Sequence, residues 1–190
     1  MKKLLILVTL IGLPCYANDI SKEFPYLIEQ TGGTTQPRYV GSYNPAVITV
    51  ADGIGDLYLG IDYNYIMANY DLSGAWKEYI KIKQKEQQYS KGSVICVEDV
   101  NISKVDLAKL IILMEGFIHK YPEFEQIVVA KQDFEFYVDT FINGKYTFET
   151  DGVNSFLSDN SRAGVKYLLR HGNPRSNVYK KVKEFFMPYL

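Results

Sequence analysis

The chain has few of the residues that most often build catalytic and metal sites. Its 190 residues include only two histidines and two cysteines. His119 follows Glu115 by four residues on an expected helix, and one histidine with one carboxylate does not hold a metal ion without further ligands. No nucleophile stands in a recognisable pattern with a base and an orienting partner. We therefore predict no catalytic residue, no metal site and no cofactor, and we expect a protein that is not an enzyme.

The sequence also lacks long apolar runs after residue 17. The longest of them, Leu110–Met114, is far shorter than the roughly 20 residues that cross a bilayer, so we expect no membrane span. The first residues, "MKKLLILVTLIGLPCYA", combine two lysines, a short apolar stretch and small residues before a cleavage point, as secretory signal peptides do. We therefore assign residues 1–17 to a signal peptide cleaved after Ala17, and we expect a periplasmic or secreted protein.

Charge of one sign is not in excess. The formal net charge of the whole chain is −1, and cleavage of the signal peptide removes Lys2 and Lys3, which makes the mature chain slightly more acidic. Such a balance gives no indication of binding to nucleic acid or to an anionic membrane. We therefore expect no nucleic-acid partner.

Only one cysteine, Cys96, remains once the signal peptide is removed. A single thiol cannot form an internal disulfide. Its neighbours Val94, Ile95 and Val97 are apolar, which favours an inert buried residue over an activated thiolate. An intermolecular disulfide and a reactive thiol are the alternatives.

Tyrosine is abundant, with 16 residues. Its side chain gives rigid, amphipathic contact area, which favours a role in recognising a protein or a glycan. Tyrosines that fill half-buried structural positions are the simpler alternative.

The spacing of apolar residues predicts a mainly α protein. We expect a small helical domain over residues 46–190, preceded by an extended N-terminal arm over residues 18–45 with room for a short helix broken at Pro25. Between residues 45 and 88 the apolar side chains recur at helical spacing. The second half of this segment, residues 75–88, is expected to carry its lysines on the face opposite its apolar stripe.

The clearest helix signal begins at Ser103. This serine is in position to cap a helix, and Asp106, three residues later, can reach back to the free amides. The helix is expected to run to about Lys120 and to end at Tyr121, because Pro122 disfavours helical geometry in the residue before it. Pro122 is itself in position to open the next helix. The expected buried stripe is Leu107, Leu110, Ile111, Met114, Phe117 or Ile118, and Tyr121.

Residues 134–150 are compatible with two structures. The alternation of apolar and polar residues, together with Asn143-Gly144, predicts a short β-hairpin. The alternative is a helix that runs to Ile142 and stops at Asn143-Gly144, which the resemblance described next favours. Two further helices are predicted over residues 158–170 and 176–187.

The order of features from Tyr58 to about Phe141 resembles the Rap/Tai family of type VI secretion amidase immunity proteins. The resemblance consists of a glycine-containing helix ("YLGIDYNYI"), a variable loop, a cysteine in a short apolar segment ("VICVED") and a capped helix ("VNISKVDLAKLIILMEGFIHKY"), followed by "YPEF" and a further apolar helix ("IVVAKQDFEFYVDTF"). It covers less than half of the chain. The chain departs from the family in its single cysteine and in having Glu98 where proline is common.

The resemblance implies a periplasmic immunity protein that binds and inhibits a cell-wall amidase toxin by plugging its cleft. The proposed contact patch is the expected loop "QQYSKG", with Gln87, Gln88, Tyr89 and Lys91 as partner-binding residues. The partner is then a protein, and the sequence also leaves a homodimer open. Two alternatives are a non-catalytic binding module of the cell envelope and a secreted hydrolase whose site is not recognised.

Overall fold

A computed structural model of the chain describes residues 19–31, 45–51, 57–90, 102–144 and 158–190. The described part is mostly helical, with one short antiparallel pair of strands, so the predicted mainly α class is confirmed. The elements in chain order are α1 (Ile20–Thr31), β1 (Val47–Ala51), β2 (Leu57–Ile61), α2 (Tyr63–Asn69), α3 (Gly74–Tyr89), α4 (Lys104–Lys120), α5 (Ile127–Asn143), α6 (Asp159–His171) and α7 (Asn177–Phe186), followed by a 3-10 turn (Met187–Tyr189).

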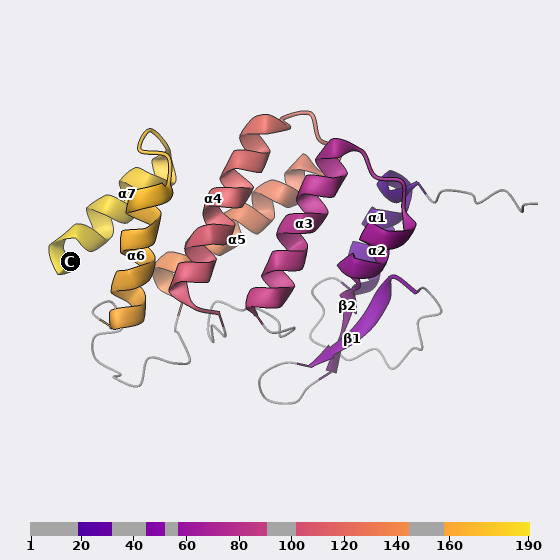
Figure 1. Cartoon of the computed structure of the whole chain (residues 1–190), viewed down its shortest axis with the longest axis horizontal. Helices are drawn as coiled ribbons and strands as arrows, with labels where there is room; N and C mark the ends of the chain where they lie inside the picture. Colours follow the sequence, from indigo (N-terminus) through magenta and orange to yellow (C-terminus); the bar gives the residue numbers. More distant parts are fainter. Residues whose placement is uncertain (1–18, 32–44, 52–56, 91–101, 145–157) are drawn as a thin grey trace, which may run out of the picture.

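The helices stand in a row around α4 (Figure 1). Helices α3 and α6 lie on either side of α4, and α5 crosses behind it. The strands, α1 and α2 lie at one end of the row, next to α3, whereas α7 lies at the other end, next to α6. Because α4 packs against α3, α5 and α6, it is the central element of the fold.

Helix α4 agrees with its sequence signals. The Ser103 hydroxyl accepts a hydrogen bond from the Asp106 backbone amide at 3.1 Å and donates one to the Asp106 carboxylate at 2.7 Å, so it caps the helix as predicted. The helix ends at Lys120, before Tyr121. The buried residues of its predicted stripe are Leu107, Leu110, Ile111, Met114 and Phe117, while Ile118 and Tyr121 are partly buried.

Helix α5 decides between the two structures expected for residues 134–150. It continues to Asn143, and the Gly144 amide donates to the Thr140 carbonyl at 2.9 Å to close its end. The helical alternative is therefore confirmed up to Asn143, and residues 145–150 lie outside the described part of the chain. The expectation for Pro122 was wrong: Pro122 lies in a turn, and α5 begins five residues later at Ile127.

The structure places the hairpin elsewhere, in a segment for which the apolar spacing predicted a helix. Strands β1 and β2 pair antiparallel, with Val47 opposite Ile61 and Ala51 opposite Leu57. The prediction of a helix from residue 45 is wrong for Val47–Ala51 and Leu57–Ile61, because the β-branched run "VITV" prefers a strand to a helix and Leu57–Ile61 pairs with it, while residues 52–56 lie outside the described part of the chain. The chain becomes helical at Tyr63, after Asp62, whose carboxylate accepts from the Tyr65 amide at 2.9 Å.

Residues 20–31 of the expected N-terminal arm form α1 and are packed into the core. Phe24 is 1% exposed and meets Trp76 edge to face, with ring centroids 5.0 Å apart. The exposed Pro25 lies inside α1 and does not break it. Edge-to-face pairs of this kind stabilise a core beyond the area they bury, so this contact fixes α1 on α3. The full aromatic cluster consists of Phe24, Trp76, Tyr79, Phe117 and Phe124.

At the other end of the row, α6 approaches α4 closely at Gly164. A Cβ atom on Gly164 would lie 2.7 Å from the backbone carbon of Lys104 and equally close to the first carbons of its side chain. Only a glycine permits this distance, because real Cβ atoms do not pack so tightly. The side chain of Asn160, one turn earlier in α6, accepts a hydrogen bond from the Lys104 amide at 3.3 Å. These contacts hold α6, and with it α7, against α4.

This close approach predicts opposite effects for two glycine substitutions. Gly164→Ala should lower the free energy of unfolding by about 1–3 kcal/mol, because the added methyl group forces α6 away from α4. Gly116→Ala, in the middle of α4, meets nothing within 4 Å and should raise stability by up to about 1 kcal/mol through helix propensity alone. Urea unfolding followed by circular dichroism measures both. Equal shifts in the two variants would contradict the packing described here.

Candidate functional site

The predicted contact patch is not the loop that the sequence suggested. Gln87, Gln88 and Tyr89 form the last turn of α3, and Lys91 lies outside the described residues. The Gln87 side chain donates to the Ile61 carbonyl at 2.7 Å, so it ties α3 to β2. Tyr89 is partly buried under the Lys109 ammonium, which lies 5.4 Å from the ring centroid. Gln88 is exposed and is therefore the member of this group most open to a partner.

The other residues singled out in the sequence do not come together. Cys96 lies outside the described residues, so its alternatives stay predictions. His119 is exposed on α4, one turn after the partly buried Glu115. Within the described ranges, no three His, Cys, Asp or Glu side chains are grouped so that they could hold a metal ion.

A surface depression lies between α5 and α7. Two adjoining hollows of about 550 and 380 Å³ share Phe134, Glu135, Asn177 and Val178. Together they form one open furrow, which we call the α5–α7 groove. Its lining residues are Glu115, Ile118 and His119 of α4, Lys131, Phe134, Glu135, Val138 and Asp139 of α5, Asn173, Arg175 and Ser176 before α7, and Asn177, Val178 and Lys181 of α7.

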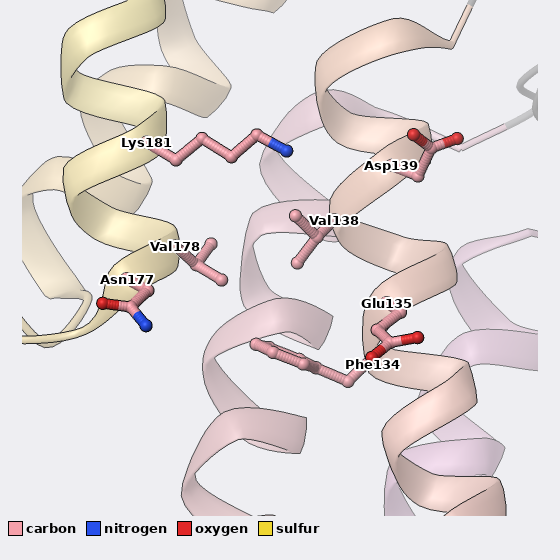
Figure 2. A pocket seen from close by; sticks show the side chains of 7 residues that line it. All are labelled: Phe134, Glu135, Val138, Asp139, Asn177, Val178 and Lys181. Atoms are coloured by element: carbon pink, nitrogen blue, oxygen red, sulfur yellow. The ribbon is translucent and has the colours of Figure 1, made fainter.

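The floor of this groove is apolar. Val178 of α7 and Val138 of α5 point toward one another across it, and the Phe134 ring extends from α5 toward α7 (Figure 2). Val138 is 9% exposed, whereas Phe134 and Val178 are partly exposed. An incoming apolar side chain would therefore find carbon atoms on both sides, which is how the centre of a protein interface is built.

The rims of the groove are charged. Exposed Glu135, Asp139 and Lys131 stand on the α5 side, while Arg175 and Lys181 stand on the α7 side. Lys181 extends from α7 toward α5 (Figure 2). Exposed charges of this kind contribute little affinity, but they select the orientation of a partner and steer its approach.

An aromatic contact joins α5 to α7 near their C-terminal ends. The Phe141 ring of α5 and the Phe186 ring of α7 meet edge to face with centroids 6.0 Å apart. The Lys104 ammonium lies 5.1 Å from the first centroid and 4.6 Å from the second. Lys104, Phe141 and Phe186 are all buried. Because this contact fixes the distal ends of α5 and α7, the groove is present before any partner arrives.

Elsewhere, a buried cluster of charged and phenolic groups joins α3 to α5. The Lys83 ammonium of α3 forms ion pairs with Glu86, one turn later, and with Asp133 of α5 at 3.3 Å. Tyr79 donates to Asp133 at 2.8 Å, and Tyr137 donates to Glu86 at 2.6 Å. The expectation that the lysines of residues 75–88 all face solvent is therefore wrong at Lys83, which is 9% exposed.

The electrostatics of this cluster oppose a catalytic role for its lysine. Burial by itself would lower the pKa of Lys83, but the charges of Asp133 and Glu86 outweigh it and hold the pKa well above its ordinary value. For Tyr79 and Tyr137, burial itself raises the pKa well above its ordinary value, because it disfavours the charged phenolate. A lysine nucleophile or base needs a lowered pKa. Lys83 therefore stays protonated and acts as a fixed cation between two carboxylates.

Removing this cation should be strongly destabilising. Lys83→Met leaves Glu86 and Asp133 partly buried without their partner, and should lower the free energy of unfolding by about 2–4 kcal/mol. The triple variant Lys83→Met, Glu86→Gln, Asp133→Asn removes the whole charge set and should recover most of that loss. Chemical denaturation of both variants tests this, and a triple variant no more stable than the single one would contradict it.

The same cluster predicts a flat response to pH in the neutral and mildly alkaline range. The folded-state pKa of Lys83 is raised above its ordinary value of 10.5. The stabilisation of the fold by the Lys83 charge is therefore complete below pH 10.5 and is lost only as the pH rises through the folded-state pKa. The stability difference between wild type and Lys83→Met should therefore be equal at about pH 7 and about pH 9. Urea titrations at the two pH values measure it, and a difference that shrinks at the higher pH would contradict the assignment.

Comparison with known proteins adds no relative. No protein-family model, no curated protein and no solved structure matches this chain. Across the part of the chain that the structure describes, no helix combines the length and the apolar character that crossing a membrane requires.

Proposed function

We propose that the protein is a binding protein without catalytic activity, and that the α5–α7 groove takes a segment of another protein. The observation that carries the proposal is the apolar floor of Phe134, Val138 and Val178, bordered by charged residues of α5 on one side and by basic residues on the α7 side. An apolar centre with a polar rim is the usual anatomy of a protein interface. An amphipathic helix laid into such a groove is one of the recurring modes of recognition.

The particular partner that we propose is a type VI secretion cell-wall amidase, which the protein would inhibit in the periplasm. The support for it is the resemblance to the Rap/Tai immunity proteins over residues 58–141, together with the secretory signal at residues 1–17. An inhibitor gains affinity when its surface is formed before binding, since less ordering is then required. The Phe141–Phe186 contact and the Lys83 cluster supply rigidity of that kind on both sides of α5.

The decisive experiment uses the chain from residue 18 to residue 190, immobilised and exposed to the secreted and periplasmic fractions of its source cell. Mass spectrometry identifies what is retained, and each retained hydrolase is then assayed on peptidoglycan with and without the protein. Stoichiometric inhibition of an amidase establishes the immunity role. Retention of a different envelope component favours a general binding module, and peptidoglycan cleavage by the protein alone would overturn the non-catalytic proposal. Light scattering of the same sample decides between monomer and homodimer.

Two substitutions on α5 and α7 test whether the groove is the contact surface. Val178→Asp places a carboxylate in the apolar floor, and Phe134→Ala removes the largest apolar side chain there. Each should weaken partner binding by about tenfold or more, as loss of a central interface residue does. Isothermal titration calorimetry with the identified partner measures the change.

The matched control for Val178→Asp is Val128→Asp. Val128 belongs to α5, is 65% exposed and lies outside the groove. This control should bind as the wild type does. Equal losses in the two aspartate variants, or no loss in either groove variant, would place the contact elsewhere on the molecule.

A further inference from the structure

Exposed apolar side chains gather at the end of α7. Seven large apolar side chains are exposed among the described residues, and four of them lie within residues 185–190. These four are between 42% and 51% exposed: Phe185, Met187, Tyr189 and Leu190. Single exposed apolar residues are normal on a protein surface, but four of them within six residues indicate an interaction surface.

The residues just before this group carry a concentration of positive charge. Lys180, Lys181 and Lys183 of α7 are exposed. Residues 160–190 contain seven lysines and arginines against Glu184 alone, which gives this stretch a formal charge of +6 in a chain whose total is −1. The near-neutral total therefore conceals a basic C-terminal stretch and an acidic remainder. The net charge of the whole chain does not reveal this separation.

The position of the segment suits a flat target. Figure 1 shows α7 and the chain end at one extremity of the row of helices, away from the strands and α1. Phe186 is buried, and the exposed Phe185 ring packs edge to face on it at 4.9 Å. The exposed side chains are thus held on an ordered helix end.

We propose that the segment from Lys180 to Leu190 docks on the surface of an anionic lipid bilayer. The four exposed apolar side chains enter the boundary between headgroups and acyl chains, and Lys180 and Lys183 lie against the lipid phosphates. Tyr189 is well suited to this boundary, because its ring is apolar and its hydroxyl group is polar. The choice of a lipid surface rests on charge complementarity, because the exposed Lys180 and Lys183 suit acidic headgroups.

The proposal does not depend on the function proposed for the groove, because different residues carry it. Lys181 lines the groove, whereas Lys180 and Lys183 do not. Docking of this type is reversible and depends on both apolar area and charge. It therefore predicts binding that requires acidic lipids and weakens as salt screens the lysines.

The test is vesicle flotation with the chain from residue 18 to residue 190. One set of vesicles mixes phosphatidylglycerol with phosphatidylcholine, and the other contains phosphatidylcholine alone. The bound fraction should be at least about tenfold higher on the anionic vesicles at low ionic strength, and should fall steeply toward about 0.5 M salt. No binding to the anionic vesicles at low salt overturns the proposal, as does equal binding to both kinds.

Paired variants separate specific docking from general attraction. Lys180→Glu with Lys183→Glu, and separately Met187→Ser with Leu190→Ser, should each reduce anionic binding by about tenfold or more. The matched controls are Lys81→Glu with Lys85→Glu, at exposed positions of α3, and Val128→Ser on α5. Both controls should bind as the wild type does, and circular dichroism checks that every variant is folded.

Two results would assign the segment differently. If the Lys81 and Lys85 reversal lowers vesicle binding as much as the Lys180 and Lys183 reversal, the attraction is diffuse and the proposed docking surface is wrong. If no vesicle binds but Met187→Ser with Leu190→Ser abolishes capture of the protein partner, the segment is a protein contact and the lipid proposal falls. Neither result bears on groove variants such as Val178→Asp, so the two proposals stand or fall separately.

Discussion

The arrangement of the C-terminal half depends on the packing around Lys104. This residue is the first of α4, is 2% exposed, and contacts residues of three other helices. Its backbone meets Gly164 of α6, while its ammonium lies over Phe141 of α5 and Phe186 of α7. A buried ammonium is tolerated only where the surroundings compensate for its lost hydration, and two aromatic faces contribute to this. Because all these contacts converge on one residue, the positions of α5, α6 and α7 are coupled, and the groove between α5 and α7 follows from them.

The N-terminal half is held by a different kind of interaction. Phe24, Trp76 and Phe124 belong to an aromatic cluster that joins α1, α3 and the turn before α5. The ion pair between Lys83 of α3 and Asp133 of α5 then fixes these two helices to each other. Polar clusters of this kind specify one register between two helices, since any shift would leave a buried charge unpaired. Helix α5 is thus fixed at its middle by α3 and at its end by Lys104. The groove wall that α5 provides has little freedom to move when a partner binds.

Some of this fold could be predicted from the sequence, and the reason is local chemistry. The helices α4, α6 and α7 are each preceded by a serine whose hydroxyl accepts an amide hydrogen bond, and a cap is visible in a short window of sequence. The hairpin was missed because the spacing of Ile61 and Tyr65 also fits a helix, and only the β-branched run before them favours a strand. The groove could not be predicted. The groove exists because α7 lies beside α5 in the fold. Residues 134 and 178 are far apart in the sequence and come together only in the folded chain.

Lys83 and the lysines of α7 both show that the sequence alone does not tell which way a lysine side chain faces in the fold. A lysine in a lysine-rich helix reads as a solvent-facing residue, and only the approach of Asp133 from another helix makes its burial favourable. In α7 the lysines do face solvent, but on different sides: Lys181 borders the groove, while Lys180 and Lys183 do not. One short helix therefore supplies a wall to the groove and a basic surface outside it. Because these two surfaces share no side chain, a partner in the groove and a lipid surface beyond α7 would not compete for the same residues.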